Sequence, residues 1–389
     1  MRTNLFKLTA AAGVLALTLT ACGSDDDGET DGALAGEGSG DDCVIEGEVP
    51  VGAALSLTGA AASYGESQKS GLELAAEALN EKEGVTYKLT IEDDQTDPKQ
   101  GITVFEGFVG DGTSVIIGPT LSNTAFQSQP IAQEGSTPVL AISNTAAGIT
   151  DQGDYIFRNS LTEAQVIPQT VAKAVETYGL ENVIVMYSND DAFTESGYDV
   201  MASSLEEEGI TVADTLTFSK ADTDFRALLT EAKAANPDAI FVSGLIEAAI
   251  PLVTQARELG LDVPIIGGNG FNNPQLMADA GDAAEGVVVG AAWNSASDNP
   301  ENTEFLAAYE EKFGSQPDQF AAQAYAGLHM IDAAVRAECS AERDAIKEGL
   351  GGISDMPTVL GSISILDNRD AEHEAVVQVV KDGQFTVLP

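Results

Sequence analysis

Short apolar runs alternate with amphipathic stretches of helical length along most of this chain. The stretch 66–82, for example, places Leu72, Ala75 and Leu79 on one face of a helix. Runs such as 114–117 are continuously apolar, which is typical of parallel strands that are covered on both faces. The first series predicts strands at 51–57, 88–92, 114–117 and 138–142, and helices at 66–82, 98–110 and 123–133.

A second series of the same kind begins after residue 158. It predicts helices at 163–178, 194–208, 223–235 and 247–259, and strands at 183–187, 211–218, 239–243 and 265–266. Because the βα alternation is written twice, we expect an α/β fold of two doubly wound, Rossmann-like lobes.

The last part of the chain, from about residue 286, is too short for a third domain. We expect it to cross back and complete both lobes, which makes several hinge strands between them. The predicted boundaries are 44–160 plus 292–360 for the first lobe, and 161–291 plus 361–389 for the second.

The N-terminus has the pattern of an export signal over residues 1–21, with a short basic region, an apolar stretch and small residues before Cys22. The tetrad Leu-Thr-Ala-Cys that ends at Cys22 resembles a bacterial lipobox, which implies a lipidated cysteine and a lipid-anchored protein on the extracytoplasmic face of the cell membrane. An ordinary secretory signal is the alternative. Residues 22–43 are rich in Gly, Asp and Glu, and we expect them to form a flexible acidic tether.

The chain has 389 residues, 43% of them hydrophobic, and a formal net charge of -44. Such a surface repels nucleic acid, so we expect no nucleic-acid partner. Catalytic and phosphate-binding motifs are absent from the sequence, which has only two histidines. We therefore expect no enzyme, no cofactor and no metal site, with His329 packed in a core and His373 exposed.

Three cysteines are present, and if Cys22 carries lipid, Cys43 and Cys339 remain as a pair. Disulfides persist in an extracytoplasmic compartment, so we predict that these two cysteines bond. Two separate free thiols are the alternative.

The segment IIGPTLSNTAF, residues 116–126, runs from an apolar strand into a turn that holds Ser122 and Asn123. Ser122 is a candidate N-cap, and the helix after it would point N–H groups outward as an anion cradle. Ser143, Asn144 and Thr145 repeat the arrangement after the strand 138–142, and the two turns should be neighbours at one sheet edge. Two simple helix caps are the alternative interpretation.

The segments of the chain, in order, resemble the type I periplasmic binding proteins that serve ABC importers of branched-chain amino acids, amides and urea. The resemblance extends from about residue 49 to about residue 385. It is carried by VGAALSLTGAAASYGESQKSG, IEDDQTDPKQ, IIGPTLSNTAF, PVLAISNTA, YIFRN, VIVMYSNDDAFTESG, AIFVSGL, QARELGLDVPIIGGNG and QFAAQAYAGL.

The resemblance implies that Ser122, Ser143 and Thr145 bind the carboxylate of a ligand between the lobes. It also implies that Tyr64, Phe193 and Phe320 are aromatic residues that line the cleft, although each could instead fill a core.

The amino acid receptors of that family have an acidic residue after the strand ending at Gly268, where it pairs with the ligand's ammonium group. This chain has Asn269 there, and a neutral amide forms no ion pair. Either another carboxylate compensates, with Asp94, Glu195 and Glu247 as candidates, or the ligand is an amide, a urea-like compound or an acid without an ammonium group.

We therefore expect a monomeric extracytoplasmic solute-binding lipoprotein, which captures a branched-chain amino acid or a related ligand by hinge closure. Its expected partners are the permease and ATPase of an ABC importer. A lipoprotein that presents its ligand to a separate sensor protein is the alternative.

Overall fold

The structure is a computed structural model, and it describes residues 35–389. The expected export signal 1–21, the lipidation site Cys22 and the first part of the tether lie outside these residues.

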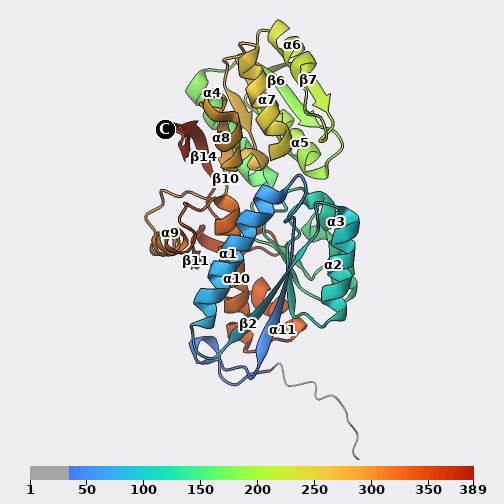
Figure 1. The fold of residues 1–389 in the computed structure, drawn as a ribbon, viewed down its shortest axis with the longest axis vertical. Helices are drawn as coiled ribbons and strands as arrows, with labels where there is room; N and C mark the ends of the chain where they lie inside the picture. The colour runs from blue at the N-terminus through green and yellow to red at the C-terminus, as the bar shows by residue number, and fades with distance from the viewer. Residues whose placement is uncertain (1–34) are drawn as a thin grey trace, which may run out of the picture. The chain divides into compact units, whose positions relative to one another are not determined.

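The first lobe is built on a parallel sheet of five strands in the order β2-β1-β3-β4-β5 (Figure 1). Its middle strands are short and fully buried, as their continuously apolar sequences predict. The elements up to the first crossing are β1 (Glu48–Leu55), α1 (Ala62–Asn80), β2 (Thr86–Asp93), α2 (Pro98–Gly110), β3 (Val115–Ile117), α3 (Ser122–Glu134), β4 (Val139–Ala141) and β5 (Ile156–Arg158).

Helices cover both faces of this sheet, with α2 and α3 on one side and α1 and α10 (Gln319–Glu338) on the other (Figure 1). The α1 and α10 backbones approach closely at Gly71, where a Cβ atom would lie 2.2 Å from the carbonyl oxygen of Ala321. The returning chain adds α9 (Pro300–Phe313), α11 (Arg343–Gly351), β11 (Met356–Thr358), β12 (Gly361–Ile365) and β13 (Ala371–Glu372).

The second lobe has a sheet of seven strands in the order β15-β14-β10-β9-β8-β6-β7. Strands β6 to β10 pair in parallel, whereas β14 pairs antiparallel with β10 and β15. Its elements are α4 (Glu163–Tyr178), β6 (Asn182–Ser188), α5 (Ala192–Glu207), β7 (Thr211–Phe218), α6 (Arg226–Ala234), β8 (Ala239–Ser243), α7 (Ile246–Glu258), β9 (Ile265–Gly267), α8 (Gln275–Ala280), β10 (Val288–Ala291), β14 (Val376–Lys381) and β15 (Gln384–Val387).

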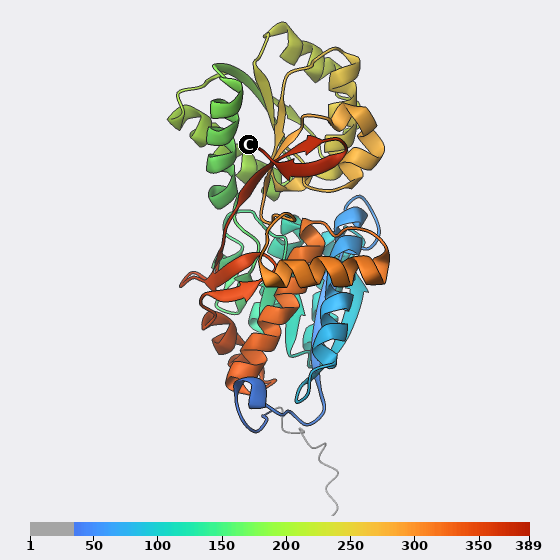
Figure 2. The ribbon, with the colours of Figure 1, turned by 90° about the vertical axis from the view of Figure 1, so that its left-hand side faces the viewer.

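The chain passes between the lobes three times: after β5, after β10 and between β13 and β14. Figure 2 shows the last crossing as dark-red chain that rises into the second lobe. A small apolar cluster of Leu161, Val166 and Ala292, with Ala375 against it, joins all three crossings. The expected α/β fold of two doubly wound lobes with crossover strands is confirmed.

Two expected boundaries differ from the structure. Ile363, Ile365 and Ala371 belong to the core of the first lobe, so the final crossing comes after β13 and not at residue 361. The acidic segment is also folded closer to the N-terminus than expected, because Ala35 forms a β-bridge with Ser340 and Glu37 with Val44. The content of Gly, Asp and Glu in this segment could not reveal its pairing partners. Ser340 is distant in the sequence, and Val44 pairs with Glu37 only after the chain has turned.

A disulfide joins Cys43 to Cys339, the pair that the sequence analysis matched. Cys339 ends α10, so the bridge fastens the folded part of the acidic segment to that helix.

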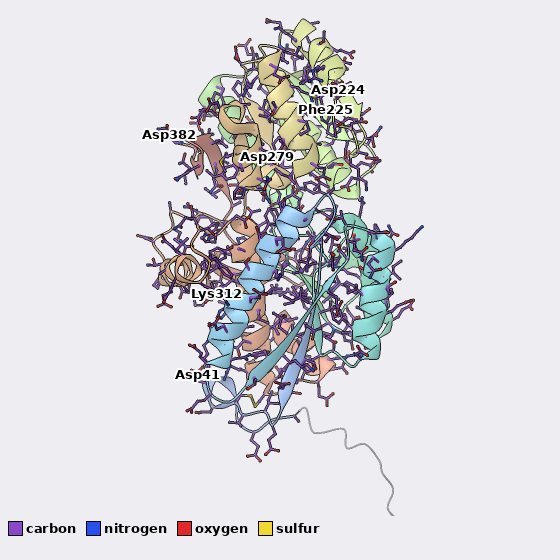
Figure 3. The ribbon with its side chains drawn as sticks, in the orientation of Figure 1. Asp41, Asp224, Phe225, Asp279, Lys312 and Asp382 are labelled. Carbon is purple, nitrogen blue, oxygen red and sulfur yellow. A yellow bond between two sulfur atoms is a disulfide. The ribbon has the colours of Figure 1, made fainter. Side chains whose placement is uncertain are left out.

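The negative charge is carried on the surface of both lobes. Asp41, Asp224, Asp279 and Asp382 are all exposed and extend from the fold, as Figure 3 shows. This distribution fits the interpretation that the acidity serves solvation.

The two histidines are both partly buried. His329, on α10, packs on the ring of Tyr325 at 4.4 Å between ring centroids, and its buried Nε2 has no hydrogen-bond partner among residues 35–389. Burial, and then the nearby Lys82, lower the pKa of His329 to about 4. His373 is half-buried at the third crossing, where its Nε2 lies 3.3 Å from the carbonyl oxygen of Asn159, so the expectation that it is exposed was wrong.

We predict that His329 makes the free energy of unfolding fall as the pH drops from about 6.5 to about 4. In this pH window His329 is protonated in the unfolded chain and remains neutral in the folded protein. Above the window it is neutral in both states. His329→Gln should remove up to about 3 kcal/mol of this dependence, measured as the difference between the urea denaturation curves of the two proteins at each pH. Parallel pH profiles for the two proteins would contradict the prediction.

Candidate functional site

A small pocket lies where the two lobes meet, at the carboxyl ends of their parallel strands, which is where open α/β sheets bind ligands. The first lobe contributes residues from α1, the β3–α3 turn, the turn after β4, and the start of α10. The second contributes residues from the start of α5 and the loops after β8 and β9. The lining consists of Tyr64, Thr120, Leu121, Ser122, Ser143, Asp191, Phe193, Leu245, Asn269, Gly270 and Phe320.

The N-terminus of α3 lines the pocket without a side-chain cap. Leu121 occupies the N-cap position, so the expectation that Ser122 would cap the helix was wrong by one residue. The first intrahelical bond runs from the N–H of Ala125 to the Leu121 carbonyl. The three N–H groups before it have no intrahelical partner and carry the positive end of the helix dipole. Ser122, with its side chain 3% exposed, adds a hydroxyl to this cradle.

The turn after β4 lies beside the α3 turn, as expected. The Ser143 hydroxyl donates to the Thr120 carbonyl at 2.7 Å and accepts from Gln68 at 2.7 Å. Asn144 does not line the pocket, because its amide donates to the Pro119 carbonyl at 2.9 Å and binds the two turns together.

Thr145, which was expected at the ligand, is buried and does not line the pocket, and its carbonyl accepts from the N–H of Glu163 at 3.2 Å. Burial raises the pKa of Glu163 to about 7, although the Thr145 hydroxyl and the Arg158 guanidinium lower it. Of the three hydroxyls that the resemblance assigned to a carboxylate, Ser122 and Ser143 line the pocket.

All three predicted aromatic residues line the pocket. Tyr64 and Phe320 come from the first lobe, with their ring centroids 4.6 Å apart, and Phe193 comes from α5 of the second. The Tyr64 hydroxyl reaches across the cleft, donates to the Gly270 carbonyl at 2.6 Å and accepts from the N–H of Ile246 at 2.7 Å. Burial, and then Glu247, raise the pKa of Tyr64, so it remains a neutral hydrogen-bond donor.

Asn123 connects the lobes instead of lining the pocket. Its amide nitrogen donates to the Asp191 carboxylate at 2.5 Å, and its oxygen accepts from the N–H of Ala192 at 2.9 Å. Asp191 also accepts from the N–H groups of Phe193 and Thr194, which caps α5. Asp191 was not predicted from the sequence, although an aspartate just before a helix is a capping signal.

None of the carboxylates proposed to replace the acidic residue at Asn269 lines the pocket. Asp94 is buried in the first lobe and accepts from Ser56, while Glu195 is exposed on α5. Glu247 has a buried Oε2 that finds no hydrogen-bond partner in the part of the chain that the structure describes, and burial raises the pKa of this carboxyl to about 7. The acidic residue that does line the pocket is Asp191.

The free space in the pocket is about 20 Å³ in this conformation, room for about one water molecule. The cross-lobe contacts of Tyr64 and Asn123 hold the walls together. A larger solute can therefore enter only if the lobes or their side chains move apart.

Residues 48–384 match the family described as periplasmic binding protein. The chain belongs to this family. It is 26% identical over 329 residues to a Leu/Ile/Val-binding protein of Rhizobium johnstonii, an alignment that covers 83% of this chain and 89% of that one. It is also 27% identical over 298 residues to a leucine-, isoleucine-, valine-, threonine- and alanine-binding protein of Pseudomonas aeruginosa, covering 76% of this chain and 79% of the relative.

Solved structures of periplasmic binding proteins have the same fold. A leucine-binding protein of Thermotoga maritima superposes with a TM-score of 0.83 at 24% identity, over 88% of this chain and 98% of that one. A solute-binding protein of Rhodopseudomonas palustris, in complex with 3,4-dihydroxybenzoic acid, superposes with a TM-score of 0.79 at 26% identity, over 86% of this chain and 94% of that one. These relatives are solute-binding proteins of extracytoplasmic transport, not enzymes, and this chain is of the same kind.

We predict that Asn123→Ala shifts the protein toward an open arrangement of the lobes, because it leaves the buried Asp191 without its partner across the cleft. The free energy that favours the closed arrangement over the open one should fall by about 1–3 kcal/mol. Small-angle scattering without ligand should show a larger radius of gyration. Asn189→Ala is the matched control, since Asn189 is exposed and its side chain forms no hydrogen bond within residues 35–389. Identical scattering from Asn123→Ala and the unaltered protein would contradict the assignment.

Proposed function

We propose that this protein is the solute receptor of an ABC importer and captures a small carboxylate, a branched-chain amino acid or a related compound, between its lobes. The observation that carries the proposal is the uncapped N-terminus of α3, which faces the pocket together with the hydroxyl of Ser122. Backbone N–H groups at a helix N-terminus form an anion site whose partial positive charge favours a carboxylate.

The remaining walls suit an apolar group attached to that carboxylate. Leu121, Phe193, Leu245 and Phe320 line the pocket, and aliphatic and aromatic solutes both gain from burial against such surfaces. The ligands in the names of the relatives share this chemistry, since branched-chain amino acids and 3,4-dihydroxybenzoic acid each combine a carboxylate with an apolar body.

Binding would work through closure of the two lobes. The carboxylate cradle belongs to the first lobe, whereas Asp191, Phe193 and Asn269 belong to the second, so a solute that touches both favours the closed form. The three crossings supply the hinge, and the contacts of Asn123 and Tyr64 across the cleft add to the closed form's stability. No covalent step is required.

We further propose that Cys22 is lipidated after removal of residues 1–21 and holds the receptor on the outer face of the cell membrane. A tether keeps the local concentration of the receptor high at its permease, so that the closed form is presented without a search through solution. The permease and its ATPase would then carry out the transport.

We predict that isothermal titration of the purified protein finds heat of binding for at least one small carboxylate among leucine, isoleucine, valine and hydroxybenzoates. Ser122→Ala should weaken that binding by about 1–3 kcal/mol, because a charge-assisted hydrogen bond is lost. Ser203→Ala, on the exposed face of α5, is the matched control and should leave the dissociation constant unchanged.

Equal affinities of Ser122→Ala and the unaltered protein would remove the α3 cradle from the site. Binding of uncharged amides or urea in preference to every carboxylate would overturn the proposed ligand class and favour the amide alternative.

We predict that Cys22→Ser moves the protein from the membrane fraction to the soluble fraction of its bacterial host and abolishes the incorporation of labelled palmitate. The reason is that the serine hydroxyl cannot form the thioether to the diacylglyceryl group. Retention of Cys22→Ser at the membrane, with an intact mass that differs from that of the unaltered protein only by the exchange of sulfur for oxygen, would exclude lipidation at this residue.

A further inference from the structure

Four amide side chains form a buried hydrogen-bonded chain from the pocket to the hinge. Asn269 lies at the pocket end, Gln319 begins α10, and Gln378 lies on β14. With Asn272, their side chains are between 1% and 9% exposed. An amide has one accepting and one donating end, so the orientation of each member restricts that of the next.

Backbone groups of the second crossing fix the chain at two of its members, Gln319 and Gln378. The N–H of Ala292 can only donate, and it lies 2.6 Å from the oxygen of Gln319. The carbonyl of Trp293 can only accept, and it lies 3.2 Å from the nitrogen of Gln378. Asn272 then donates to the oxygens of both Gln319, at 3.1 Å, and Gln378, at 3.3 Å. All four contacts agree on one set of orientations.

The orientation of Gln319 determines that of Asn269. Because the oxygen of Gln319 accepts from Ala292, its nitrogen must donate, and its neighbour is the Oδ1 of Asn269. The Asn269 Nδ2 is therefore the free end. Within residues 35–389 it has no acceptor, and it is not among their buried polar atoms without a partner. Asn269 thus offers the pocket an N–H donor.

We infer that the solute carries a hydrogen-bond acceptor where it meets Asn269, and that Gln319 is the positioning residue that sets this polarity. The inference rests on the proposed function and narrows its ligand class. Because Asn269 and Ser122 line the same pocket, we place the acceptor next to the carboxylate, as in a 2-oxo or 2-hydroxy acid. A 2-ammonio group would place its own N–H donors against the N–H donor of Asn269.

Asp191, the acidic residue in the pocket lining, is already occupied. One of its oxygens accepts from Asn123 and lies 3.8 Å from the Lys220 ammonium, while the other accepts from the N–H groups of Phe193 and Thr194. An ammonium group on the solute would have to compete with these partners.

Matched acids that differ at one position test the inference. On the leucine scaffold these are L-leucine, 2-oxo-4-methylpentanoate, 2-hydroxy-4-methylpentanoate and 4-methylpentanoate. On the aromatic scaffold they are phenylglycine, phenylglyoxylate, mandelate and phenylacetate. The oxo or hydroxy member of at least one scaffold should bind about tenfold or more tightly than the amino member, as measured by titration calorimetry.

Gln319→Glu tests the role of Gln319 through ligand preference. If Gln319 had a purely structural role, this substitution would not change which ligand is preferred. One Glu oxygen still accepts from Ala292, and the other now requires a donor, so the Asn269 amide turns over and presents its oxygen to the pocket. In Gln319→Glu, the ratio of the affinities for the amino acid and for its oxo or hydroxy analogue should shift toward the amino acid by about tenfold or more. Gln319→Met restricts neither orientation of the Asn269 amide. It should therefore bring the two affinities closer together. Gln316→Glu, an exposed change of the same charge, is the control and should keep the original preference.

Each result bears on the inference. Tightest binding of the amino acid by the unaltered protein would overturn this inference and leave the proposed function intact. Binding of no member of either series would overturn this inference. If isoleucine, valine and the hydroxybenzoates also fail to bind, the proposed function is overturned as well. If Gln319→Glu fails to fold, as judged by its melting curve, the comparison of Gln319→Met with the unaltered protein decides, and an unchanged preference in Gln319→Met overturns the role of Gln319.

Discussion

The three passages of chain between the lobes are the constraint on which the rest of this structure depends. They meet in a small apolar cluster of Leu161, Val166, Ala292 and Ala375, so each passage is packed against the others. Three connections leave the lobes less freedom of relative movement than one connection would. Residues separated by more than two hundred positions, such as Tyr64 and Gly270, can therefore meet in a single register.

The same passages also reach the chemistry of the pocket. Ala292 and Trp293 belong to the second passage, and their backbone groups hold the amide side chains that end at Asn269. A change in the path of this passage would disturb Gln319 and then Asn269, because their orientations are linked. Hinge geometry and ligand chemistry are thus connected through hydrogen bonds, in a region with almost no access to water.

Much of the fold could be predicted from the sequence, because the alternation of apolar runs and amphipathic stretches is a local signal. The turns at Ser122 and Ser143 were found in the same way, since polar residues follow directly after buried strands. Which residue of a turn faces the pocket is not a local property. Asn144 and Ser143 are neighbours of similar polarity, and only the contacts made by the folded chain separate the residue that joins the turns from the one that lines the site.

The features of the site that could not be predicted from the sequence are contacts between residues that are distant along the chain. Asn123 meets Asp191 across 68 positions, and Asn269 meets Gln319 across 50, with no repeated pattern to connect either pair. The start of α3 differs by one residue from its expected position, which is the usual uncertainty of a helix boundary.

Helix α10 begins at the pocket with Gln319 and Phe320 and runs for 20 residues, about 30 Å, to Cys339. The disulfide to Cys43 thus fixes the entering chain to the first lobe at the end of α10 remote from the ligand. A mechanical load applied through the N-terminus would be borne by this covalent joint and the rigid helix, bypassing the passages between the lobes. The second lobe could then still move relative to the anchored first lobe. A pull on the N-terminal segment would therefore not force the cleft open.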